Sequence, residues 1–207
     1  RKIDWKSMES WMKYSGGDSG GSTKDEAIFY MFERGFSWQT LNEWDIGWDN
    51  ITERISIPIR NESGELVGFK GRSHNNEPRY IALGGIEHGF EPYETSRILF
   101  ALDRVIKTKN NASIIVREGE LNTIAMHSHG FHNTVGISGK NLSDYQAELI
   151  KKHASKAIFY FDDEEDAIKA AKKIRKYMPT SVVPSTSKDP AEISRAEILS
   201  ILDAQRS

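Results

Sequence analysis

The sequence predicts an α/β fold whose second half holds a four-stranded, mainly parallel sheet. The first observation is a regular alternation: four short apolar segments, each suited to a buried strand, are each followed by a segment with helical spacing. Such alternation is typical of parallel sheets with right-handed crossovers. The second observation is a period-two hairpin in the first half, which predicts a smaller α+β subdomain there. The strands of the second half are expected at 113–116, 134–137, 157–161 and 181–183.

The first half is expected to contain helices around a hairpin. A Gly- and Ser-rich segment at 16–22 predicts a linker after a short N-terminal helix. Residues 54–59 alternate between apolar and polar side chains, a turn follows at 61–64, and residues 66–69 form the returning strand. Pro58 predicts an edge strand or a bulge. Helices are expected at 4–14, from 23 to Gly35, from a Ser37 cap to Trp44, and at 96–106.

The second half supplies the helix signals that complete the alternation. Ser143 and Gln146 have the spacing of a capping box, and Pro190 suits the first turn of a last helix. The linker at 16–22 and the pair Asn110-Asn111 mark two boundaries. They predict three segments: an N-terminal helix and linker at 1–22, an α+β subdomain at 23–110, and an α/β domain at 111–207. The helices are expected at 121–129, from Ser143 onward, at 165–177 and at 190–204.

The overall composition excludes several classes of protein. Its 207 residues are 38% hydrophobic and 28% charged, as in ordinary globular proteins. A net charge of −2 argues against wrapping of duplex DNA by phosphate neutralisation alone. The lack of cysteine excludes disulfides and thiolate zinc sites and fits a cytoplasmic setting. No apolar run approaches the ~20 residues that span a bilayer. Because the chain begins at Arg1 and not at methionine, we expect it to be part of a longer protein.

Carboxylates follow three of the four expected strands. Glu118 follows the first strand, Asp162 the third, and Asp189 lies shortly after the fourth. Ligands of open α/β sheets bind outside the carboxyl ends of the strands, so these side chains are expected to meet at one edge. Alone, the acidic run at 162–166 also suits a solvated helix N-terminus. Crowded carboxylates without cysteine favour Mg²⁺ or Mn²⁺ and phosphoryl-transfer chemistry.

The same motifs resemble the TOPRIM domain shared by primases, topoisomerases and some nucleases. They are Glu-Gly-Glu-Leu-Asn at 118–122, Phe-Asp-Asp-Glu-Glu at 161–165 and Lys-Asp-Pro at 188–190. The preceding segments, 30–37 with 44–48 and 54–60 with 64–72 and 78–80, are similar to the catalytic core of bacterial-type (DnaG-like) or phage DNA primases. Topoisomerases and TOPRIM nucleases lack that hairpin, so the resemblance favours a primase.

The resemblance implies roles for particular side chains. Glu118, Asp162 and Glu164 are the expected catalytic residues and metal ligands, and Asp189 is a further metal ligand. The chain departs from the family at two of the acidic positions, because Glu164 and Asn122 stand where aspartate is usual. Glu120 is a possible compensation for Asn122. The residues expected to bind template or nucleotide are Arg54, Lys70, Arg72 and Arg79.

The function implied is that of a DNA primase core, which synthesises short RNA primers on single-stranded DNA by metal-dependent nucleotidyl transfer from ribonucleoside triphosphates. Two alternatives stay open: a TOPRIM nuclease, and a TOPRIM nucleic-acid-binding module that has lost activity. A replicative helicase and a zinc-binding module elsewhere in the full-length protein are the expected partners. The expected location is the cytoplasm of a bacterial cell or phage-infected host. We expect Asp162→Ala to abolish primer synthesis and leave the fold intact.

Overall fold

The computed structural model describes residues 23–109, 112–184 and 193–204, so the helix and linker expected at 1–22 lie outside it. The chain divides into two compact units. The first contains the residues up to Ile59 together with Leu66–Tyr93, and the second contains Arg60–Glu65 and the residues from Glu94 onward. The division expected at residue 110 stays a prediction. Within the described residues, the segment from Glu94 onward groups with the second unit.

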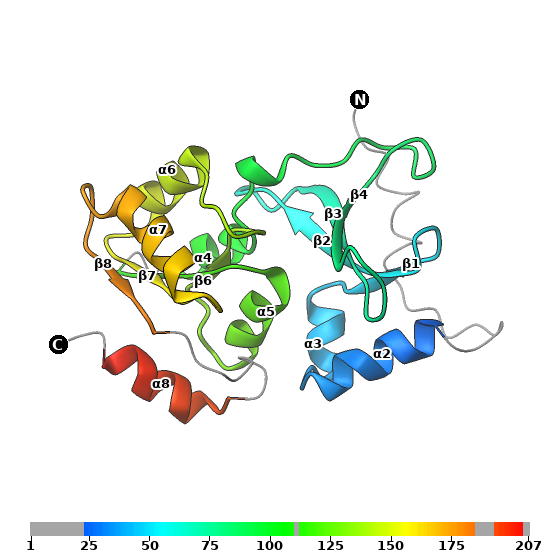
Figure 1. Cartoon of the computed structure of the whole chain (residues 1–207), viewed down its shortest axis with the longest axis horizontal. Coiled ribbons are helices and arrows are strands. Elements are labelled where there is room, and N and C mark those ends of the chain that lie inside the picture. The colour runs from blue at the N-terminus through cyan, green and yellow to red at the C-terminus, as the bar shows by residue number, and fades with distance from the viewer. Residues whose placement is uncertain (1–22, 110–111, 185–192, 205–207) are drawn as a thin grey trace. The chain divides into compact units, whose positions relative to one another are not determined.

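The described residues of the first unit form a four-stranded sheet accompanied by two helices (Figure 1). Its strand order is β1-β2-β3-β4, and the pairs β1–β2 and β3–β4 are antiparallel. This arrangement confirms the predicted α+β subdomain. Its elements are α2 (Thr23–Glu33), α3 (Trp38–Glu43), β1 (Gly47–Asp49), β2 (Arg54–Arg60), β3 (Leu66–Arg72) and β4 (Tyr80–Leu83).

Of two local signals in this unit, the cap at Ser37 is confirmed, whereas Pro58 does not mark an edge strand, because β2 lies between β1 and β3. The Ser37 hydroxyl accepts a hydrogen bond from the Thr40 backbone N–H at 3.1 Å, which caps α3. Pro58 lies inside β2, but β1 pairs only with Arg54, Ile55 and Ser56. The proline therefore occupies a stretch of β2 that β1 does not cover, where its missing N–H costs no bond to that strand.

The second unit has the predicted parallel sheet. Its strand order is β6-β5-β7-β8, and all three strand pairs are parallel. The central pair, β5 and β7, places the carboxyl ends of these two strands next to each other. The elements are η1 (Thr95–Arg97), α4 (Leu102–Lys107), β5 (Ile114–Arg117), α5 (Glu120–Ser128), β6 (Thr134–Gly136), α6 (Asp144–His153), β7 (Ala157–Phe159), α7 (Glu164–Ile174), β8 (Thr180–Val182) and α8 (Arg195–Asp203).

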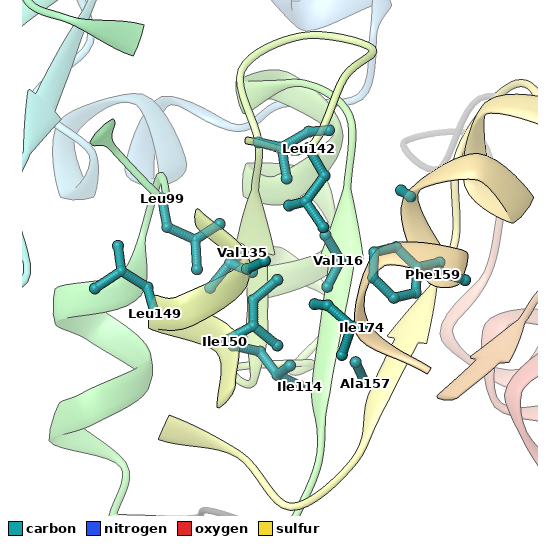
Figure 2. Close-up of a cluster of buried hydrophobic side chains, with 14 of the residues drawn as sticks. Leu99, Ile114, Val116, Val135, Leu142, Leu149, Ile150, Ala157, Phe159 and Ile174 are labelled. Atoms are coloured by element: carbon teal, nitrogen blue, oxygen red, sulfur yellow. The ribbon is translucent and has the colours of Figure 1, made fainter. Parts of the chain in front are cut away.

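Apolar side chains cover both faces of this sheet, as the continuous apolar strands require. On one face, Val116 lies between Val135 and Phe159, with Ile150 and Ile174 packed onto them from α6 and α7 (Figure 2). The opposite face is covered by α5 and α8. Its buried side chains are Ile115, Met126, Phe131, Ile158, Tyr160, Val183, Ile193, Ile198 and Leu202. Successive strand residues therefore alternate between two cores.

The helix expected at 96–106 is wrong in its first half. A short 3-10 turn, η1, comes first, and α4 begins only at Leu102. Between them, Phe100 and Gly136 exchange two backbone hydrogen bonds, of 2.8 and 3.0 Å. Ala101 then adopts a left-handed φ of +65° before α4 starts. The apolar spacing fits a helix, but pairing with the exposed edge of β6 is the alternative that the fold adopts.

The remaining helices of the second unit agree with the predicted ones to within a few residues. The capping box of Ser143 and Gln146 is present at the start of α6. A second capping box, formed by Ser194 and Glu197, sets the start of α8. The expected start at Pro190 lies outside the described residues. No helix in the described ranges is both long and apolar enough to cross a membrane.

Candidate active site

Glu118 and Asp162 meet where β5 and β7 end. Each acid follows its strand by one or a few residues, and the two strands are parallel neighbours. The backbone N–H of Asp163 donates to Oε1 of Glu118 at 3.3 Å, so the two loops are in direct contact. Both loops lead into helix N-termini, with Gly119 before α5 and Asp163 before α7. Helix N-termini favour negative charge, so the fold itself helps to hold these carboxylates.

Two donors hold the Asp162 carboxylate from the protein side. Nη2 of Arg117 donates to Oδ1 of Asp162 at 2.9 Å. Nδ2 of Asn122 lies 3.0 Å from Oδ1 and 2.9 Å from Oδ2. Asn122 therefore presents its amide nitrogen to Asp162, in an orientation that suits a hydrogen-bond donor.

Arg117 is a site residue that sequence reasoning missed. Along β5 the side chains alternate, so Arg117 points to the same face as Ile115. There the guanidinium lies over the ring of Tyr160, 4.1 Å from its centroid, and is only 1% exposed. A buried arginine needs a negative partner, and Asp162, itself 62% exposed, is such a partner. The signal in the sequence was a basic residue at the inward-facing end of a buried strand.

The pKa of the Glu118 carboxyl is raised above its usual value. Desolvation by burial is the largest cause, and repulsion from the Asp162 carboxylate adds to it. The backbone N–H of Asp163 and the Arg117 guanidinium act in the opposite direction. An ionised Glu118 is therefore held at a cost in free energy, which a bound cation would relieve.

This shift predicts the pH dependence of stability. Because the pKa is higher in the folded state, stability falls as pH rises from the unfolded pKa through the folded one, and stays reduced above it. Without metal, Glu118→Gln is therefore expected to be more stable than the wild type near pH 8, and to match it near pH 4. Urea denaturation followed by far-UV circular dichroism measures both. Equal stability near pH 8 would contradict the inferred cost.

The other predicted ligands are not gathered into the same cluster. Glu164 is exposed at the start of α7. Asp189 lies outside the described residues, and Glu120 is fully buried in the first turn of α5. Within the described ranges, no group of three acidic or histidine side chains forms a ready metal cage. Glu118 and Asp162 still fit a hard divalent cation, because Mg²⁺ typically takes one or two carboxylates and keeps several waters.

The predicted basic residues of the first unit differ in exposure. Arg54, Lys70 and Arg72 are largely buried, whereas Arg79 is 65% exposed. The guanidinium of Arg54 donates to the carbonyl oxygen of Pro78 at 2.8 Å. Only Arg79 among the four has its charged group largely open to solvent.

Arg72 is enclosed by aromatic rings. Its guanidinium carbon lies 4.5 Å from the centroid of the Tyr80 ring and 5.6 Å from that of Tyr30. Nη2 of Arg72 donates to the Tyr30 hydroxyl oxygen at 2.5 Å, and Arg34 donates to the same oxygen at 3.0 Å. Burial would raise the pKa of the Tyr30 hydroxyl, but the two arginines outweigh burial and lower it.

Comparisons with known proteins find similar sequences and similar folds. Residues 115–193 match the Toprim-like family, a range that includes Glu118 and Asp162. The DNA primase of Campylobacter jejuni is 32% identical over 158 residues, which cover 68% of this chain and 24% of that protein. The chain is therefore similar to DNA primases and contains a Toprim-like segment. It also matches a DNA primase domain from Pseudomonas aeruginosa at 16% identity, with a TM-score of 0.79 and coverage of 97% of this chain and 77% of that one.

A second solved structure, described as a DnaG primase catalytic domain bound to ssDNA, matches this chain at 18% identity with a TM-score of 0.72. The match covers 90% of this chain and 72% of that one. This chain spans about a quarter of the length of curated relatives such as the Campylobacter jejuni protein. At these identities the solved structures establish the fold, and the fold confirms the predicted TOPRIM architecture.

Proposed function

We propose that this chain is the catalytic core of a DNA primase, which extends short RNA primers on single-stranded DNA from ribonucleoside triphosphates. One observation carries the proposal: Glu118 and Asp162 meet at the carboxyl edge of a Toprim sheet, in a chain that aligns with primase catalytic cores over nearly its whole length. The same edge is where open α/β sheets bind their ligands.

The cation that fits this edge is Mg²⁺ or Mn²⁺. Both are hard cations that bind carboxylate oxygens and phosphates. When bound, such a cation neutralises the charge that develops on the transferring phosphoryl group. Glu118 and Asp162 would hold it. Glu164 and Asp189 are proposed as further ligands that complete the site when nucleotide is present.

The reaction joins the 3′-oxygen of the primer to the α-phosphorus and releases pyrophosphate. The attacking hydroxyl loses its proton as the new P–O bond forms. Glu118 is our candidate for the acceptor, because its carboxylate lies at the carboxyl edge of the sheet, in contact with the Asp162–Asp163 loop. Arg117 and Asn122 hold the Asp162 carboxylate in a fixed orientation.

We propose that the β2–β3 hairpin and the segment after it contribute the surface for nucleic acid or nucleotide. Arg79 is open to solvent and can contact phosphate oxygens directly. Arg54, Lys70 and Arg72 add positive potential from positions that are largely buried. The proposed partners are single-stranded template, ribonucleoside triphosphates, a replicative helicase and a zinc-binding module. The proposed location is the cytoplasm of a bacterial or phage-infected cell.

A primer-extension assay tests the proposal. The protein is incubated with an RNA primer annealed to a DNA template, labelled ribonucleotides, and Mg²⁺ or Mn²⁺, and the products are separated on a denaturing gel. A pre-annealed primer removes any need for a separate module at initiation. We expect a ladder of extended RNA that is absent without divalent cation. An Asp162→Asn preparation, purified identically, controls for contaminating polymerases.

The alternatives give different products. Shortened template strands that appear only with wild-type protein would assign a nuclease. If the protein binds single-stranded DNA but neither extends the primer nor shortens the template, the chain would be assigned as a binding module. Either outcome would overturn the primase proposal.

A further inference from the structure

The hydrogen bonds to Asp162 occupy most of the lone pairs of its carboxylate. An ionised carboxylate has about four lone-pair sites on its two oxygens. Among the described residues, three donor contacts reach these oxygens, one from Arg117 and two from Asn122. Oδ1 takes two of them and Oδ2 takes one. About one lone pair, on Oδ2, is left for a cation.

The two donors are fixed in the protein interior. The Arg117 side chain is buried against Tyr160, and Asn122 is 9% exposed in the first turns of α5. The Asp162 side chain, by contrast, is mostly open to solvent. Arg117 and Asn122 are here called the Asp162 clamp. They bind the carboxylate on the side that faces the protein interior and leave the side that faces solvent accessible.

The clamp also sets the charge of the site. Glu118 and Asp162 each carry one negative charge, and Arg117 offsets one of them. Asn122 adds none, so the four side chains together carry one net negative charge. An aspartate at position 122 would double it and would place a second carboxylate about 3 Å from both Asp162 oxygens, where like charges repel unless a cation lies between them.

We propose that the Asp162 clamp restricts Asp162 to one-oxygen coordination, so that Glu118 and Asp162 take a single divalent cation and Asn122 acts as a hydrogen-bond donor and not as a metal ligand. A carboxylate that bridges two cations needs two free lone pairs, and the contacts from Arg117 and Asn122 leave about one on Asp162. This inference rests on the proposed metal site, but it concerns what Arg117 and Asn122 do to that site.

Mn²⁺ binding tests the clamp without any turnover. Mn²⁺ is titrated into the full chain and followed by electron paramagnetic resonance, and binding that persists in Asp162→Asn is subtracted. We expect one Mn²⁺ per wild-type chain. Asn122→Ala removes a donor without adding charge and is expected to bind Mn²⁺ as tightly as the wild type or more tightly. Asn122→Asp is expected to bind at least about tenfold more tightly or to take up a second ion.

Melting curves separate the clamp from a purely structural role. Asn122→Asp is expected to melt lower than the wild type without Mn²⁺ and to gain more from added Mn²⁺ than the wild type gains. A structural role alone would lower the melting temperature by the same amount in both conditions. Asn76→Asp, an exposed position in the first unit, makes the same change in net charge and is expected to leave both readouts unchanged.

Two results would overturn the inference. One is a loss of Mn²⁺ affinity of about tenfold or more in Asn122→Ala, which would make Asn122 a ligand. The other is two Mn²⁺ ions per wild-type chain at the Asp162-dependent site. If wild-type and Asp162→Asn proteins bind Mn²⁺ identically, the proposed metal site itself fails. A primer-extension failure alone would leave the Mn²⁺ results standing.

Discussion

Asp162→Asn is expected to reduce primer extension at least about 100-fold while lowering the free energy of unfolding by about 1 kcal/mol. Asparagine keeps the shape of the side chain and one oxygen that accepts from Arg117 or Asn122. It loses the negative charge that a divalent cation needs. Extension of an annealed primer measures the first quantity, and urea denaturation followed by far-UV circular dichroism measures the second.

The matched substitution Asp162→Ala is expected to behave differently, because it also removes the partner of a buried guanidinium. Leaving Arg117 without this partner is expected to cost about 1–3 kcal/mol of stability, a range kept low because Asp162 is itself largely exposed. The alanine variant would therefore combine a lost ligand with a weakened fold. Primer yields like those of the wild type in Asp162→Asn would exclude Asp162 from the chemistry.

Arg72→Met is expected to lower the free energy of unfolding of the first unit by about 2–4 kcal/mol. Methionine fills much of the volume, but it cannot donate to the Tyr30 hydroxyl or supply the charge that lies against the Tyr80 ring. Tryptophan fluorescence reports on this unit, because Trp38, Trp44 and Trp48 lie in it and the chain has no tryptophan after position 48. Far-UV circular dichroism on the same samples follows both units.

Arg79→Met is the control for this substitution. Arg79 is exposed, and its contact with Glu77 is long, at 3.9 Å, so the stability change is expected to stay within about 0.5 kcal/mol. If Arg79 contacts a phosphate of single-stranded DNA, its loss makes the negative slope of log K against log salt less steep by about 0.7. Unchanged stability in Arg72→Met would show that the buried geometry of Arg72 is unimportant to the fold.

The sequence was sufficient for the architecture and for the central pair of acids. Alternating strands and helices constrain a parallel sheet strongly, and strand ends in such a sheet share one edge. The sequence alone therefore predicts that Glu118 and Asp162 lie close together. The interruption of the expected helix at Phe100 could not be predicted in this way, because the spacing of Ile98, Leu99 and Leu102 suits a helix. The pairing with Gly136 that replaces the helix is a contact between distant parts of the chain.

The finer chemistry of the site was less predictable for a physical reason. Residue type gives Asn122 an oxygen and a nitrogen, and only the fold decides which end faces Asp162. In the sequence, Arg117 resembles an ordinary polar residue at the end of a strand. The alternation of side chains along β5 places it on the same buried face as Ile115. Arg72 reads as a surface cation, although packing between Tyr30 and Tyr80 buries it. Sequence patterns therefore predict the backbone topology better than they predict which groups surround a charged side chain.

The turn at 60–65 has a consequence for how the chain folds. Although β2 and β3 belong to the first unit, this turn belongs to the second, where Glu62 contacts Lys152 at 3.2 Å across 90 residues of sequence. Nζ of Lys152 reaches the turn only after α6 exists. The entropic cost of closing so long a loop grows slowly with length, but contacts at such separation slow folding. During synthesis, the turn emerges early, so its ion pair with Lys152 can form only after α6 has been made.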